Sequence, residues 1–275
     1  MPTNTGEQFE RLENIMARLR AEGGCPWDRE QDLRSLRPFL LEEAFEVLDE
    51  MDKVSAGQGQ WLSLCEELGD LLFQIVFHAQ LAREQGHFAL AQVAQGIADK
   101  IERRHPHVFG TVRADTSDAV LSNWAKLKAA ERKAKTGDEG SALDGVPAAA
   151  PALLRAERLT EKASRVGFDW PDYKGARAKI DEELAELDRA IESGDRTQKE
   201  AELGDLLLSV VNLARFIQTP AEDALRGANA RFTARFRAVE AKLRERGVAF
   251  GQAEMTLLDQ LWNEAKAEEA RPTRR

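Results

Sequence analysis

Apolar residues recur at helical spacing along most of the chain. The first stripe consists of Leu36, Leu40, Ala44, Val47 and Met51. Steps of three and four residues place such side chains on one face of an α-helix. Further stripes run over residues 64–79, 184–191 and 203–214. The alternating patterns and hairpin dipeptides typical of strands are almost absent. The sequence therefore predicts an all-α protein.

The chain contains the same series of motifs twice. Residues 134–151, AKTGDEGSALDGVPAAAP, have no periodic stripe and are rich in Gly, Ala and Pro, which is typical of a linker. We therefore predict helical domains over residues 1–135 and 153–275, joined by a linker over residues 136–152. The repeated motifs are GCPWD at 24–28 and VGFDW at 166–170, EEAFE at 42–46 and EELAE at 182–186, and ELGDLL at 67–72 and 202–207. A duplicated helical unit explains this order.

Pairs of acidic residues recur three positions apart in both halves. They are Glu43 with Glu46, Glu67 with Asp70, Glu183 with Glu186, and Glu202 with Asp205. Residues three apart lie on one helix face, so two antiparallel helices in each half would bring four carboxylates together. Mutual repulsion would then raise their pKa values unless a cation bound there. An all-oxygen set favours Mg²⁺, with Mn²⁺ as a substitute.

The alternative interpretation is an ordinary solvated helix face, because Glu is a good helix former. Gly69 and Gly204 favour the metal site, since each costs roughly 1 kcal/mol relative to Ala inside a helix. We expect such glycines where a backbone approaches closely. Glu66 is replaced by Ala201 in the second copy, whereas the paired acids persist.

Basic and aromatic residues follow the acidic motifs in each half. Lys100 and Arg104 lie one helical turn apart, as do Arg231 and Arg235, so each pair can hold phosphate oxygens. Flat faces for a nucleobase can come from four tryptophans: Trp27, Trp124, Trp170 and Trp262. Ordinary surface charge and core packing remain the alternatives for these residues.

Composition narrows the function classes. The chain has 275 residues, 43% of them hydrophobic, and a net charge of −9, which argues against stable binding to nucleic acid or an anionic membrane. No apolar run approaches the roughly 20 residues of a membrane span, and the N-terminus does not resemble a signal peptide, so a cytoplasmic location is expected. Cys25 and Cys65 are too few for a disulfide framework or a zinc site. The phosphate-binding loop GxxxxGK[ST] is absent.

Taken together, these motifs resemble the MazG nucleoside triphosphate pyrophosphohydrolases. The resemblance extends from about Arg11 to Glu268 and includes GCPWDREQ, LLEEAFEVLDE, EELGDLLFQIVFHAQLA, KIERRHPHVFG, VGFDW, EELAELD and AELGDLLLSVVNLAR. It implies an all-α pyrophosphohydrolase fold, four-helix bundles assembling as homodimers, and Mg²⁺ dependence. It also implies conversion of a nucleoside triphosphate and water into a monophosphate and pyrophosphate, with broad base tolerance.

The resemblance also implies roles for individual residues. The metal ligands and catalytic residues fall on Glu183, Glu186, Glu202 and Asp205, with Glu43, Glu46, Glu67 and Asp70 as the first-half equivalents. The nucleotide contacts fall near Lys179, Glu182, Arg231, Arg235 and Trp262, with Lys100, Arg104 and Trp124 in the first half. Arg231 departs from the Lys common in the family. The second half is favoured as the catalytic one.

Two functions from other classes compete with this hypothesis. A di-iron carboxylate bundle would use Glu84 with His87 and Glu102 with His105, but Gly86 and Pro106 indicate helix ends there. All four histidines lie in the first half, so the second half could not build that site. A nucleotide sensor or adaptor, with one or both halves non-catalytic, remains the main alternative.

Overall fold

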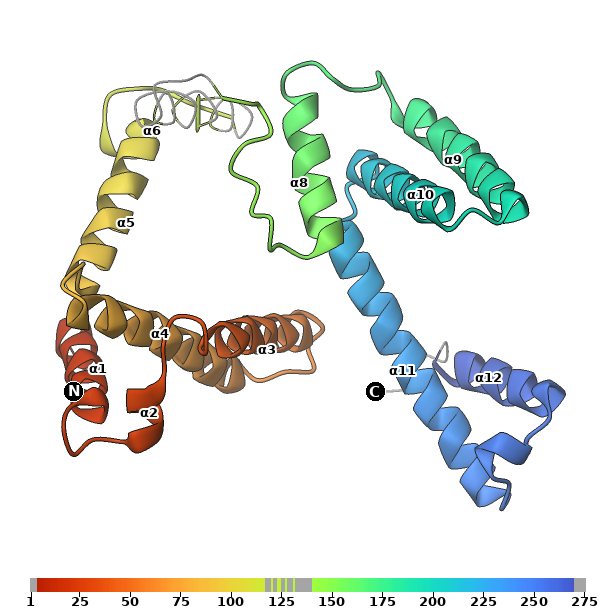
Figure 1. Ribbon diagram of the computed structural model, residues 1–275, viewed down its shortest axis with the longest axis horizontal. Helices are drawn as coiled ribbons and strands as arrows, with labels where there is room; N and C mark the ends of the chain where they lie inside the picture. The colour runs from red at the N-terminus through yellow and green to blue at the C-terminus, as the bar shows by residue number, and fades with distance from the viewer. Residues whose placement is uncertain are drawn as a thin grey trace. The chain divides into compact units, whose positions relative to one another are not determined.

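The computed structural model is built from α-helices, and the residues it describes include no β-strand (Figure 1). Those residues are 4–116, 120, 123–124, 127, 131 and 140–269. The prediction of an all-α fold is confirmed. The chain divides into two compact units, Met1–Lys135 and Thr136–Arg275. The predicted linker, 136–152, lies partly outside the described residues, and residues 140–151 contain no helix.

The first unit is organised around a helical hairpin. Its described helices are α1 (Thr5–Arg20), α2 (Pro26–Glu30), α3 (Arg37–Ser55), α4 (Trp61–Glu84), α5 (Leu90–Arg104) and α6 (Pro106–Phe109). Helices α3 and α4 pack along each other, and α1 packs against α4. The buried core consists of Met16 of α1, Leu36, and Val76, Phe77 and Leu81 of α4. This core packs against one side of the α3–α4 hairpin.

The second unit contains two helical hairpins. Its elements are α8 (Ala152–Ser164), α9 (Tyr173–Ser193), α10 (Arg196–Phe216), α11 (Ala221–Glu245), the 3₁₀ turn η1 (Phe250–Gln252) and α12 (Met255–Glu269). Helix α10 packs against α9 and α8, and α11 packs against α12 (Figure 1). Val239, Leu243 and Leu261 form the buried core of the α11–α12 hairpin.

Two residues make the sharp turn between α9 and α10. Gly194 ends α9 in the left-handed region, with φ of 76°, where a side chain would be strained. Asp195 follows as the N-cap of α10, and its Oδ1 accepts from the backbone N–H groups of Thr197 and Gln198. Such a cap stabilises a helix by about 1 kcal/mol. The Gly-Asp pair therefore sets the two acidic helices antiparallel.

Many residues of the apolar stripes are exposed rather than buried. Val47, Val76 and Val211 are buried as the periodicity predicts, but Met51, Leu68, Ile75, Leu184, Ile191, Leu203 and Leu207 are all at least 42% exposed. The periodicity therefore predicted the helices correctly but not the partner of each apolar face. Within the described residues, no helix is long and apolar enough to cross a membrane.

Gly69 and Gly204 do not mark a close approach within the described chain. A Cβ atom built on either glycine would meet no other atom within 4 Å, outside its own helix backbone. The expectation of a tightly packed backbone at these positions is therefore wrong for the single chain, because the space beside both helices is open.

Candidate metal and nucleotide site

Three acidic side chains of the α9–α10 hairpin converge. Glu183, Glu202 and Asp205 each place a carboxylate oxygen within 4.8 Å of the others. Glu186 does not belong to this group; it lies within the same distance of Glu182 and Glu183, and its carboxylate also pairs with Arg189. Glu183 is therefore shared by both groups of carboxylates.

Glu183 is the most enclosed of these acids, with 4% of its surface exposed. One carboxylate oxygen, Oε1, forms an ion pair with the ammonium of Lys179 at 2.6 Å. The other, Oε2, is buried and has no hydrogen-bond partner among the residues described. A buried charged oxygen without a partner is costly unless a ligand satisfies it. Together with the all-oxygen donor set, this orphaned atom fits a hard divalent cation.

Lys179 carries the positive charge next to these acids. Its ammonium lies 2.8 Å from Glu182 and 2.6 Å from Glu183. Hydrogen bonds to Glu182 and then Glu183 raise the pKa of Lys179 well above its usual value, so the side chain stays protonated throughout the physiological range.

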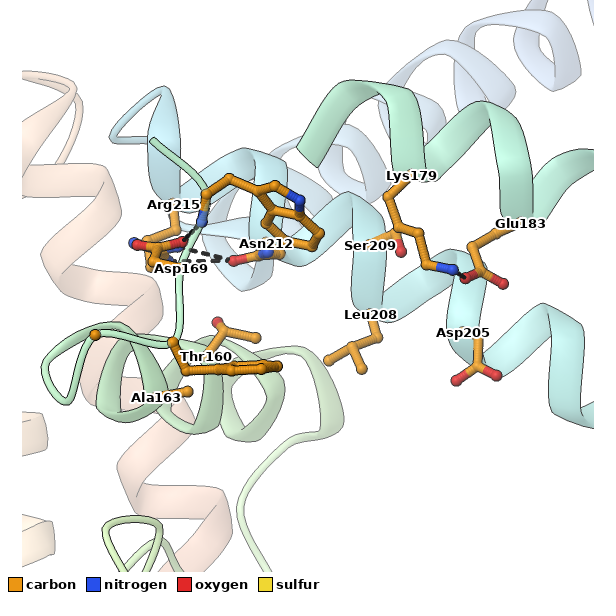
Figure 2. A pocket seen from close by; sticks show the side chains of 13 residues that line it. Thr160, Ala163, Asp169, Lys179, Glu183, Asp205, Leu208, Ser209, Asn212 and Arg215 are labelled. Atoms are coloured by element: carbon orange, nitrogen blue, oxygen red, sulfur yellow. Dashed lines mark hydrogen bonds and ion pairs between the residues drawn. The ribbon is translucent and has the colours of Figure 1, made fainter. Parts of the chain in front are cut away.

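A cavity of about 630 Å³ opens beside this cluster. Glu183, Asp205 and Lys179 line one end, while Asp169, Asn212 and Arg215 line the other (Figure 2). Phe168 and Trp170 contribute aromatic surface to the wall. The volume lies within the range of small-molecule sites, and such sites combine apolar walls with a few polar groups.

The first unit holds a related acidic cluster. Glu43, Glu46 and Glu67 place carboxylate oxygens within 4.8 Å of one another. Asp70 is not in that group, but it is close enough to affect both neighbours. Partial burial and then repulsion from Asp70 and Glu46 raise the pKa of Glu43; partial burial and then repulsion from Glu46 and Asp70 raise the pKa of Glu67.

Comparison with known proteins shows the family to which the two acidic hairpins, α3–α4 and α9–α10, belong. A family model described as the MazG nucleotide pyrophosphohydrolase domain matches residues 31–109 and 173–246, and so covers both acidic hairpins. The chain belongs to this family. It is 42% identical over 267 residues to the nucleoside triphosphate pyrophosphohydrolase of Escherichia coli (strain K12). The matched region covers 95% of this chain and 98% of that protein. It is 41% identical over 261 residues to the nucleoside triphosphate pyrophosphohydrolase/pyrophosphatase MazG of Thermotoga maritima, spanning 95% of this chain and 96% of that protein.

The two MazG domains differ around their acids. When Glu43 is matched with Glu183, Phe39 stands at the position of Lys179. When Asp70 is matched with Asp205, Phe77 stands at the position of Asn212. Phe77 is 1% exposed, and Phe39 packs against the same core cluster. The first MazG domain thus has aromatic core side chains where the second has an ammonium and an amide.

The basic and tryptophan residues form separate clusters. The guanidinium of Arg235 lies 5.9 Å from the ring centre of Trp262 and 2.7 Å from Glu269. In the first MazG domain, Arg104 lies 5.8 Å from the ring centre of Trp124 and 2.5 Å from Glu131, and hydrogen bonds from Arg104 and Arg103 lower the pKa of Glu131 to about 2.

Helices α11 and α12 contribute no residue to the cavity lining. The structure therefore does not bring Arg231, Arg235 and Trp262 to the carboxylates within one chain. Arg231 is exposed on α11, and Lys100 lies on α5. The nucleotide-contact roles of these residues stay predictions.

The histidine pairs do not form a metal site among the residues described, where the candidate metal groups contain only carboxylates. Glu84 ends α4 and pairs with Arg20 at 2.7 Å, and His105 is the C-cap of α5. The helix ends expected from Gly86 and Pro106 are thus present.

Five polar residues of the cavity were not among the predicted site residues: Thr160, Ser209, Asp169, Asn212 and Arg215. The last three are joined by hydrogen bonds. A signal for them exists in the sequence. Asp169 belongs to the VGFDW motif, and Asn212 follows Asp205 by seven residues, two helical turns along the same face. An Asn or Arg at helical spacing is common on any surface, however, so this signal gains meaning only beside the acidic motif.

The raised pKa values in the first MazG domain predict how its stability depends on pH. In the folded chain Glu43 and Glu67 hold a proton more tightly than their ordinary pKa of 4.5 implies, so stability is greatest below that value and falls as the pH rises through the raised pKa values. Without divalent cations, Glu43→Gln is therefore expected to raise the unfolding temperature at pH 7.5 by roughly 2 °C. Thermal unfolding followed by circular dichroism measures this.

The control for this prediction is the exposed neighbour Glu42, because Glu42→Gln removes the same charge outside the cluster. The gain from Glu43→Gln should also vanish at pH 4. An equal gain from both variants, or a gain that persists at pH 4, contradicts repulsion within the cluster.

Proposed function

We propose that the second MazG domain hydrolyses nucleoside triphosphates to nucleoside monophosphates and pyrophosphate. The observation that carries the proposal is the convergence of Glu183, Glu202 and Asp205 at one end of a cavity of ligand size. The names of the two relatives and their near full-length similarity support the same reaction.

Identification of the products tests this proposal. The full chain is incubated with each of several nucleoside triphosphates and Mg²⁺, and the products are separated by ion-exchange chromatography. A monophosphate and pyrophosphate in equal amounts support the proposal, whereas a diphosphate and orthophosphate contradict it.

The acids of the second MazG domain fit Mg²⁺, with Mn²⁺ as a substitute. Glu183, Glu202 and Asp205, with Glu186 beside them, would hold the ion. When bound, such an ion supplies positive charge that polarises the triphosphate and makes water a better nucleophile. Lys179 lies at the same end of the cavity, and its ammonium can donate to phosphate oxygens. Water then attacks the α-phosphorus and pyrophosphate leaves; one of Glu183, Glu186 and Glu202 accepts the proton.

Broad base tolerance is part of the proposal. Aromatic side chains at Phe168 and Trp170 and the aliphatic Leu208 line the cavity. Such surfaces accept any flat base, because stacking and apolar contact depend little on the positions of donors and acceptors. Any difference in affinity between bases must then come from the few polar groups that line the cavity.

The first MazG domain is proposed to bind a cation without turning over nucleotide. It keeps the carboxylates Glu43, Glu46 and Glu67. Phe39 replaces the ammonium that would contact phosphate, and Phe77 fills the position of Asn212. The first MazG domain therefore corresponds to the non-catalytic nucleotide sensor or adaptor, which is the alternative function predicted from the sequence.

We further propose that the chain works as a homodimer. The acidic hairpins expose large apolar side chains: Leu41 and Phe45 of α3 and Leu203 and Leu207 of α10 are all at least 47% exposed. A second copy covering these faces would complete a four-helix bundle.

The open space beside Gly204 tests the dimer. An interior glycine costs about 1 kcal/mol relative to Ala, and no contact among the described residues requires one at this position. If a second copy packs closely there, Gly204→Ala introduces a clash. We expect Gly204→Ala to weaken the dimer at least about 10-fold, a loss of about 1.4 kcal/mol, as measured by sedimentation equilibrium.

The matched control is Gly96 of α5, which also has open space around its Cβ position. Gly96→Ala should leave the dimer unchanged and stabilise the helix by about 1 kcal/mol. A wild-type chain that sediments as a monomer contradicts the dimer, and an unweakened Gly204→Ala dimer contradicts the close approach at Gly204.

A further inference from the structure

We propose that Asn212 and Asp169 read the edge of the nucleobase, and that they favour bases with a carbonyl beside a ring N–H over bases with an amino group. Hypoxanthine, guanine and uracil belong to the first class, and adenine and cytosine to the second. The proposal rests on the proposed function for the kind of ligand, and adds the side chains that discriminate between bases.

The amide of Asn212 is held in one orientation. Arg215 donates to its Oδ1 from Nε at 3.2 Å and from Nη2 at 3.1 Å. The oxygen therefore faces Arg215, and the amide nitrogen points the other way. That nitrogen has no hydrogen-bond partner among the described residues, and Asn212, which is 8% exposed, lines the cavity. An unpaired amide donor at the cavity wall is free to bind an acceptor atom of a ligand.

Asp169 supplies an acceptor next to this donor. Its Oδ1 accepts from Nη2 of Arg215 at 2.6 Å and from the backbone N–H of Trp170 at 2.9 Å. The same Arg215 nitrogen thus bonds both Asp169 and Asn212, so the two side chains are neighbours (Figure 2). Asp169 also lines the cavity, and its Oδ2 makes no hydrogen bond within the described part of the chain.

A donor beside an acceptor matches the imide edge of an oxo base. The base carbonyl accepts from the Asn212 amide nitrogen, and the adjacent ring N–H donates to Asp169. Adenine and cytosine present the reverse order, an amino donor beside a ring acceptor. To receive them, Asn212 would have to turn its oxygen into the cavity and break both hydrogen bonds to Arg215. Unmade hydrogen bonds in an enclosed site discriminate strongly between ligands.

The distance along α10 suits a nucleotide. Asp205 and Asn212 are seven residues apart, which is about 10.5 Å along a helix axis. The acidic end and the Asn212 end are therefore separated by roughly the length of a nucleoside (Figure 2). With the phosphates at the carboxylates, the base reaches Asn212.

Trp170 is fixed at the base end. A Cβ atom added at Gly175 would lie 2.3 Å from Cδ1 of the Trp170 indole, so the ring packs directly against the α9 backbone. Residues 166–170, which include Asp169 and Trp170, lie outside the segments that match the MazG family model. The family model therefore covers Asn212 and Arg215 but not the loop that carries Asp169 and Trp170.

The alternative is that Asn212, Arg215 and Asp169 only fasten the VGFDW loop to α10. If these residues only fasten the loop, the binding affinity should not differ between bases. The affinities of nucleoside monophosphates distinguish the two interpretations and do not depend on hydrolysis. Inosine and adenosine monophosphates differ at this edge, as do uridine and cytidine monophosphates.

The test is titration calorimetry of these four monophosphates with the full chain. We expect the oxo compounds to bind about 10-fold more tightly than their amino counterparts. Asn212→Asp replaces the donor with an acceptor and keeps the contact with Arg215, so the preference should disappear or reverse. Asn14→Asp, at an exposed position of α1 in the other unit, is the control and should leave the ratio unchanged.

Equal binding of inosine and adenosine monophosphates by the wild type overturns the proposal, as does an Asn212→Asp variant that keeps the wild-type ratio. If Asn212→Asp does not fold, Asp169→Asn serves instead and should reduce the ratio. The proposed function can fail separately. If the chain hydrolyses no triphosphate but binds inosine monophosphate more tightly than adenosine monophosphate, the proposed enzymatic activity is wrong and the proposed recognition of the base is supported.

Discussion

Glu202→Gln is expected to lower kcat/KM for pyrophosphate release by about 1,000-fold while leaving the helices folded. The carboxylate of Glu202 lies within 4.8 Å of those of Glu183 and Asp205, and it belongs to the group that fits a divalent cation. Gln keeps the shape and the helical preference of Glu but removes the charge, and loss of one such electrostatic group costs this much in other enzymes. Steady-state kinetics and far-ultraviolet circular dichroism measure the two effects.

The matched control is Glu67→Gln, because Glu67 occupies the same motif position in the first MazG domain. If the second domain is the catalytic one, this variant should retain at least about half of the wild-type kcat/KM, a change too small to reflect a lost catalytic group. Equal losses from both substitutions would show that both domains turn over substrate. Full activity of Glu202→Gln would contradict the assignment of the site.

Lys179→Met should lower kcat/KM about 100-fold and, at the same time, tighten the binding of divalent cations. The ammonium of Lys179 lies within 2.8 Å of both Glu182 and Glu183 and so neutralises part of the acidic cluster. Removing it leaves more negative charge for a cation and no donor for the phosphates. Because the pKa of Lys179 is raised, its charge is kept, and the ion pair contributes to stability up to a pH above the usual lysine pKa.

Mn²⁺ binding measured by electron paramagnetic resonance, together with steady-state kinetics, tests both effects of Lys179→Met. Lys174→Met is the control, since Lys174 is exposed in the first turn of the same helix and does not line the cavity. Weaker Mn²⁺ binding in Lys179→Met would contradict a neutralising role. Unchanged kcat/KM would contradict a contact with the substrate.

The part of the site that follows from local spacing could be predicted. Glu183 and Glu202 lie in motifs at helical spacing, and the Gly194-Asp195 turn is a strong signal for antiparallel helices. Glu202 and Asp205, three apart, then lie on one helix face and meet Glu183, although Glu186 does not join this group. The association of Glu183 with Lys179 follows in the same way, because residues four apart on a helix are neighbours.

The base end of the cavity could not be predicted, because it depends on contacts between elements far apart in the sequence. Asp169 lies in a loop, and its partner Arg215 is 46 residues away on α10. No periodicity links the two. The same limit applies to Arg235 and Trp262, which pair with each other across the α11–α12 hairpin and do not reach the cavity within one chain.

Apolar periodicity shows where helices form but not what covers each face. Leu203 and Leu207 of α10 follow the predicted stripe and are both 48% exposed, whereas Val211 on the same helix is buried. A face that packs on a second copy has the same sequence pattern as one that packs within the chain. Burial therefore had to come from the structure.

Anomalous X-ray scattering from crystals grown with Mn²⁺ tests the central claim most directly, because it locates the ion independently of activity. The account predicts an anomalous peak within bonding distance of carboxylate oxygens of Glu183, Glu202 and Asp205, and the loss of that peak in Glu202→Gln crystals. Mn²⁺-dependent release of pyrophosphate from crystals with no peak at these three residues would contradict it.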